Sequence, residues 1–136
     1  MIDTITQSLS VDTSRIYISG FSNGADFTQF LAGQIPCTFA AAAAIAGRTA
    51  NQASQVDTTL VFNLPASTPI AVMIVRGKQD SSVPYFGGLN NNGTNTSSVF
   101  QDLQYWLNSN FCNQNSFTSF NIGDTVETRT YNNCSG

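Results

Sequence analysis

The chain has 136 residues, of which 41% are hydrophobic and 10% are charged, a composition that suits one globular domain with its own core. Eight acidic and five scattered basic residues give a formal charge of -3, which excludes the clustered cations that nucleic-acid binding needs. No apolar run reaches the roughly 20 residues that span a bilayer, so we expect no membrane partner.

The first part of the chain alternates between helical and strand patterns. Residues 15–19 alternate between apolar and other side chains, which predicts a short strand that Gly20 ends. Residues 25–34 return to helical spacing and predict a helix. A shorter amphipathic helix is predicted at the start of the chain from Ile2, Ile5 and Leu9.

Two further segments read as buried strands. Residues 39–45 are almost all alanine and predict a strand, although periodicity alone leaves a helix open. Residues 69–75 form a continuous apolar run of the kind that a parallel sheet buries on both faces. The polar residues 48–64 between them read as a loop. Strands and helices in alternation predict an α/β fold with a mostly parallel sheet.

The second half of the chain begins with loops. Residues 76–84 leave the carboxyl end of the preceding strand, and residues 87–98 form a low-complexity surface loop. That loop contains two formal glycosylation acceptors, Asn92 and Asn95. Helical spacing then returns in Val99, Leu103, Trp106 and Leu107 and ends near Asn108, and we expect one more strand at the edge of the sheet within residues 113–136.

One short stretch carries a catalytic motif, Gly20-Phe21-Ser22-Asn23-Gly24. The pattern G-x-S-x-G turns so sharply from strand to helix that side chains at Gly20 and Gly24 would collide with neighbouring backbone. The turn exposes the serine hydroxyl and directs the next amide and the helix N-terminus toward a developing oxyanion. We interpret Ser22 as a nucleophile; the alternative is a turn serine that caps the following helix.

Three stretches together resemble a known family. "VDTSRIYISGFSNGADFTQFLA", "FAAAAAIAG" and "TPIAVMIVRGKQDSSVPYFGG" are similar, in this order, to the poly(3-hydroxybutyrate) depolymerase and feruloyl esterase family. The resemblance implies a secreted, cofactor-free serine esterase with part of the α/β-hydrolase fold, a three-layer α/β/α sandwich. It implies that Ser22 is the nucleophile, that the amide of Asn23 lines the oxyanion hole and that Asp80 is the triad acid.

The position of Asp80 in the chain agrees with this assignment. It follows the predicted strand 69–75 at the sheet edge where ligands bind in parallel sheets, and on this fold the order is serine, acid, histidine. There Asp80 would orient an imidazole and stabilise its charged form. The alternative is that Asp80 merely forms the turn that contains Ser81 and Ser82.

The chain contains no histidine, so the base that should activate the serine is missing. Lys78, the only lysine, is a weaker candidate because a Ser-Lys pair belongs to other local patterns. We therefore expect residues 1–136 to be the C-terminal portion of one catalytic domain, cut at both ends, with the histidine and the second oxyanion donor outside it. The alternative is a pseudoenzyme that binds esters or glycans without catalysis.

The three cysteines bear on the compartment. The resemblance implies a disulfide between Cys112 and Cys134, whereas two buried thiols are the alternative; Cys37 is left over, either free and buried or paired elsewhere. Low charge, a single lysine and a composition rich in Asn, Ser, Thr and Gln indicate an extracellular protein, in which disulfides persist. Without histidine or C-x-x-C spacing, no metal site is expected.

Substrate, partners and a few more side chains complete the expectations. The resemblance implies a polyester or plant cell-wall ester as substrate and a monomer as the full-length form. Arg76 stands where the family commonly has histidine, which puts the anchoring of the following loop in doubt. Tyr85, Phe86 and Trp106 either face the substrate or, as we favour, pack in the core or a lid.

Overall fold

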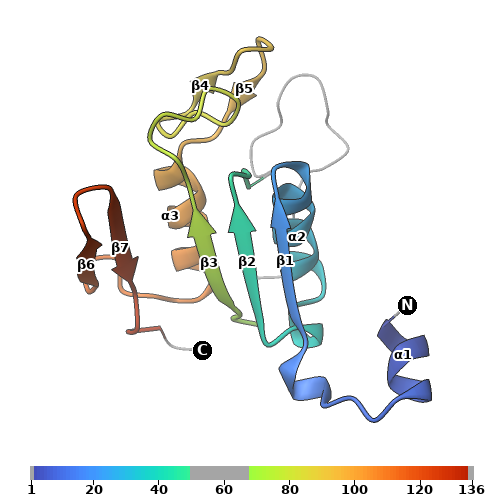
Figure 1. The fold of residues 1–136 in the computed structure, drawn as a ribbon. Helices are drawn as coiled ribbons and strands as arrows, with labels where there is room; N and C mark the ends of the chain where they lie inside the picture. Colours follow the sequence, from blue (N-terminus) through green and yellow to red (C-terminus); the bar gives the residue numbers. More distant parts are fainter. Residues whose placement is uncertain (1, 50–67, 135–136) are drawn as a thin grey trace.

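The computed structural model describes residues 2–49 and 68–134, and Figure 1 shows their arrangement. The elements in chain order are α1 (Ile2–Ser8), η1 (Thr13–Arg15), β1 (Tyr17–Phe21), α2 (Asn23–Gln34), η2 (Pro36–Thr38), β2 (Ala41–Ile45), β3 (Ala71–Val75), β4 (Gly88–Leu89), β5 (Asn95–Thr96), α3 (Val99–Ser109), β6 (Thr118–Ile122) and β7 (Val126–Thr130). Each helix and strand predicted before residue 110 is present in the predicted order, with β4 and β5 added before α3, and β1 runs through Gly20 rather than ending at it.

The main sheet has three parallel strands in the order β1-β2-β3. Phe21 pairs with Ile45, and Ile45 pairs with Val75, so the three strands end together. Their arrows in Figure 1 point toward one edge, beyond which the β4–β5 hairpin lies. The α/β class with a parallel sheet is therefore confirmed, and the loops after β1, β2 and β3 all leave from this carboxyl edge.

Helices α2 and α3 cover one face of the sheet. Trp106 of α3 donates its indole N–H to Gln29 Oε1 of α2 over 2.9 Å, in a buried contact that joins the two helices. At the far end of α3, the Asn110 side chain accepts from the amide of Ile70 and donates to its carbonyl. The core between helices and sheet is built around Ala32, Ala42, Ile70 and Trp106.

The opposite face of the sheet is open within the described part of the chain. Alternate residues of the strands point to it: Tyr17, Ser19, Phe21, Ala41, Ala43, Ile45, Ala71, Met73 and Val75. Phe21 is 69% and Met73 62% exposed. The prediction that strand 69–75 is buried on both faces is wrong for these residues, because an unbroken apolar run looks the same whether one or two layers cover it.

The C-terminal segment differs from its prediction. Instead of one strand at the edge of the sheet, residues 118–130 form the separate antiparallel hairpin β6–β7, which pairs Thr118 with Thr130. Phe120, Ile122 and Val126 share one side of the hairpin, but they are 68%, 57% and 48% exposed, so this side does not pack on the parallel sheet. A second, short ladder joins β4 to β5 within the predicted low-complexity loop. Most of the predicted loop 48–64 lies outside the described residues.

A disulfide joins Cys112 and Cys134, in agreement with the expected pairing. It ties the end of α3 to the end of the hairpin, across a sequence separation of 22. Cys37 is free and exposed in η2, so the alternative of a buried thiol is wrong. Among the described residues, no helix has both the length and the apolar character to cross a bilayer.

Candidate active site

Ser22 lies in the turn between β1 and α2 with a backbone that L-residues rarely adopt. Its φ is 54° and its ψ is -123°, a conformation that costs on the order of 1–3 kcal/mol. Backbone bonds on both sides hold it there: the Ser22 amide donates to Ile45 O over 3.0 Å, and its carbonyl accepts from Ala25 and Asp26. Ser22 is exposed and its side chain makes no capping bond, although the residue occupies the N-cap position of α2.

The glycines that flank the serine are not equivalent. A Cβ on Gly20 would overlap the carbonyl group of Gly24 and stand 2.7 Å from Thr28 Oγ1, so glycine is required where β1 passes under α2. A Cβ on Gly24 would meet nothing within 4 Å. The expectation that both flanks need glycine is therefore wrong at Gly24.

Asn23 is the first residue of α2. The first amides of a helix have no acceptor within it, and the helix dipole places partial positive charge at this end. The backbone beside the Ser22 hydroxyl is therefore suited to bind an anionic oxygen. The Asn23 amide, for which the sequence predicts an oxyanion contact, is the first amide of this helix.

Asp80 lies in the loop after β3 and organises it. Its Oδ1 accepts from the amides of Ser82 and Val83, over 2.8 and 2.9 Å. Asp80 thus forms the turn proposed as its simpler role, but both bonds use one oxygen, so the loop holds the carboxylate without drawing on Oδ2. The turn former and the triad acid are compatible roles for this side chain.

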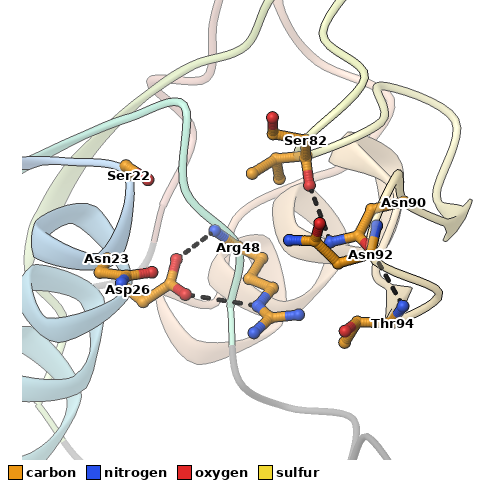
Figure 2. A pocket seen from close by; sticks show the side chains of 9 residues that line it. Ser22, Asn23, Asp26, Arg48, Ser82, Asn90, Asn92 and Thr94 are labelled. Atoms are coloured by element: carbon orange, nitrogen blue, oxygen red, sulfur yellow. Dashed lines mark hydrogen bonds and ion pairs between the residues drawn. The ribbon is translucent and has the colours of Figure 1, made fainter.

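A pocket of about 350 Å³ brings the two loops together. Ser22 and Asn23 line one side of it, and Ser82 faces them from the loop of Asp80, with Asn90 and Asn92 beside it (Figure 2). The other lining residues are Asp26, Arg48, Val83 and Thr94. Asp80 itself does not line the pocket. Ser82 and Val83, whose amides donate to the Asp80 carboxylate, do line it.

An ion pair between Asp26 and Arg48 lines the pocket between its two sides. Asp26, one turn after Ser22, accepts the Arg48 amide over 2.7 Å, and its other oxygen lies 3.3 Å from Arg48 Nε. Gly47 permits this approach, since a Cβ there would stand 2.9 Å from Asp26 Oδ1 and overlap Ala25. The pair fastens the loop after β2 to the start of α2.

A second ion pair is buried behind the loops. The side chains of Arg76 and Asp102 are each 1% exposed, with Arg76 Nη1 3.4 Å from Asp102 Oδ2. Arg76 also donates to the carbonyls of Gly47 and Ser97, and the Ser97 hydroxyl donates to Asp102 over 2.6 Å. Arg76 thus ties the start of the loop after β3 to the carbonyls of Gly47 and Ser97.

Burial dominates the ionisation of this pair. It lowers the pKa of Arg76, although the carboxylate of Asp102 acts in the opposite direction. Burial also raises the pKa of Asp102, against the hydrogen bond from Ser97 and the charge of Arg76, which lower it. The pair therefore carries a desolvation cost that its mutual attraction does not fully offset.

Lys78, the alternative candidate for the base, lies away from Ser22. Lys78 is directed to the C-terminal hairpin, with Nζ 3.9 Å from Glu127 Oε2, and does not line the pocket. Nor do these residues hold a group of three or more histidine, cysteine or acidic side chains that could bind a metal.

Sequence reasoning missed much of the pocket. Asp26, Arg48, Asn90, Asn92 and Thr94 were not predicted as site residues, because nothing local marks them: Asp26 reads as a helix residue and the others as loop. The one available signal was their place in the predicted fold, since each of these residues follows the carboxyl end of a predicted strand or lies in a loop at that edge of the sheet. No protein-family model and no curated protein sequence matches this chain, so any function must be argued from this geometry.

Proposed function

We propose that the chain provides the nucleophile, the acid and one oxyanion donor of a serine carboxylic ester hydrolase with the three-layer α/β-hydrolase fold. The observation that carries the proposal is the turn at Ser22. A strained, exposed serine at the carboxyl edge of a parallel sheet shares a pocket with the loop that Asp80 organises. A serine in a sharp strand-to-helix turn, with its side chain exposed, is what the G-x-S-x-G motif of serine hydrolases requires.

In the proposed reaction, Ser22 Oγ attacks the ester carbonyl carbon while its proton passes to a base. The carbonyl oxygen becomes an oxyanion, which the Asn23 amide and the N-terminus of α2 stabilise. The C–O bond to the alcohol then breaks, and the alcohol leaves with the proton from the base. Water attacks the acyl-enzyme in the same way, giving the acid and free Ser22.

The base is an imidazole from outside these 136 residues, since the chain contains no histidine. Asp80 Oδ2 is the oxygen that we assign to its N–H, because the turn of Ser82 and Val83 uses Oδ1. We further propose an extracellular, cofactor-free, monomeric enzyme that acts on a polyhydroxyalkanoate-type polyester or a feruloyl cell-wall ester. The lack of histidine favours a second candidate, a binding module that has lost catalysis.

Chemical rescue tests the proposal on the chain itself. The 136-residue protein is incubated with a fluorophosphonate probe, with and without added imidazole, beside the Ser22→Ala and Asp80→Asn variants. We expect imidazole to accelerate labelling of the unmodified chain, with no labelling of Ser22→Ala and slower labelling of Asp80→Asn, because small-molecule imidazole replaces the missing base.

Two results would count against the hydrolase. Labelling that is equal in the unmodified chain and in Ser22→Ala would place the reaction on another residue. No labelling at any imidazole concentration, in protein whose circular dichroism shows it folded, would favour the binding module instead.

A further inference from the structure

The stretch from Ser81 to Gln101 contains no charged residue, yet it builds the outer wall of the pocket. It also carries large apolar side chains that the protein leaves in solvent. Phe86 is 75%, Leu89 73% and Phe100 47% exposed. Singly exposed apolar residues are ordinary, but a contiguous group of them marks an interaction site.

Three side chains of this stretch form one aromatic cluster, which we call the aromatic platform: Tyr85, Phe86 and Phe100. The rings of Phe86 and Phe100 lie 6.4 Å apart and 30° from parallel. The half-buried Tyr85 meets both rings edge-on, at 5.1 and 5.7 Å. Tyr85 thereby orients the two exposed rings. Among the described residues, no aromatic side chain outside this cluster stacks on them.

The aromatic platform and the pocket are parts of one structural unit. Val83 lines the pocket two residues before Tyr85. The Tyr85 carbonyl accepts the amide of Val99, at the start of α3, over 2.9 Å. Asn90 ties the hairpin to the same loop by donating to the Ser82 carbonyl over 3.1 Å. A ligand that extends out of the pocket along this wall therefore comes within reach of the rings.

The chemistry of this wall fits a ligand that is neutral and rich in hydroxyl groups. Ser82, Asn92 and Thr94 line the pocket with hydroxyl and amide groups, each of which both donates and accepts hydrogen bonds. A polyester offers such groups only acceptor oxygens, whereas a sugar offers donors and acceptors. The C–H face of a sugar ring is also slightly positive and packs on the negative face of an aromatic ring.

We propose that the aromatic platform binds a neutral polysaccharide chain and holds it beside the pocket. This assignment rests on the proposed function: the polysaccharide then provides the alcohol group of the ester that Ser22 attacks. The absence of charge from Ser81 to Gln101 leaves an anionic polymer without a cation to recognise on this wall.

Affinity electrophoresis of the unglycosylated 136-residue chain tests the proposal. Native gels contain hydroxyethyl cellulose or arabinoxylan, and all variants carry Ser22→Ala so that binding is measured without turnover. We expect both polymers or one of them to retard the protein. Phe86→Ala with Phe100→Ala should weaken that binding about 10-fold, which corresponds to roughly 1.4 kcal/mol for the two rings together.

Phe120→Ala is the matched control, since Phe120 is equally exposed but lies on β6. It should leave the retardation unchanged. No retardation by either polymer, or retardation that survives loss of both rings, overturns the proposal. Adsorption to a poly(3-hydroxybutyrate) film that depends on the rings, without retardation by polysaccharide, also overturns it. Binding that persists while rescue of Ser22 fails separates the platform from the hydrolase.

Discussion

Gly20 passes so close to Gly24 that the Gly24 carbonyl group occupies the space where a side chain of residue 20 would lie. Strand β1 and the first turn of α2 are thereby held in contact directly beneath Ser22. The reverse does not hold, because the space beyond Gly24 is empty. Two glycines of one motif therefore have different physical reasons to be present.

This asymmetry predicts opposite effects of the same substitution. Gly20→Ala forces the turn apart and should destabilise the protein by about 1–3 kcal/mol, the usual cost of overpacking. Gly24→Ala should be neutral or stabilising by up to about 1 kcal/mol, because alanine favours a helix. Urea unfolding followed by circular dichroism measures both. Equal destabilisation of the two variants would contradict the close approach at Gly20.

The positive φ of Ser22 predicts a conflict between stability and reactivity. Ser22→Gly relieves the strained backbone, while Ser22→Ala keeps it, and both remove the hydroxyl. We expect the glycine variant to unfold at a free energy about 1 kcal/mol higher than the alanine variant, the relief of strain exceeding the greater entropy of glycine in the unfolded chain. Both should lose labelling by fluorophosphonate. A glycine variant less stable than the alanine variant would show that the turn stores no strain.

The raised pKa of Asp102 predicts how stability responds to pH. Between the ordinary value of 3.8 and the raised value, the folded state binds a proton that the unfolded state has lost. The contribution of Asp102 to stability is therefore fully present below pH 3.8 and declines as the pH rises through the folded value.

Asp102→Asn isolates this effect, because asparagine does not titrate. The unfolding free energy of the unmodified protein minus that of the variant should fall as the pH rises from 3.8 and then level off. Denaturant titrations at a series of pH values measure the difference. A rise over the same interval would mean that attraction to Arg76 outweighs the burial of the carboxylate.

The order of the elements through α3 and the sharp turn at Ser22 could be predicted from the sequence, because both depend on local patterns. The apolar strand 71–75 and the spacing of α2 are visible without knowledge of the fold, and Gly20 and Ser22 lie two residues apart. The pairs Asp26–Arg48 and Arg76–Asp102 join residues that are distant along the chain, so no local pattern predicts them. The hairpin β6–β7 was misassigned for a different reason: its alternation predicts a strand but does not say which sheet the strand joins.

The open face of the sheet has a thermodynamic consequence. The heat capacity of unfolding reflects mainly the apolar surface that water reaches only after the chain unfolds. Side chains such as Tyr17, Phe21 and Met73 are already largely hydrated in the folded chain and add little to that change. Calorimetry should therefore find a heat-capacity increment below the usual value of about 12–15 cal/mol/K per residue. The free energy of unfolding should then vary less with temperature than is usual for a protein of this size.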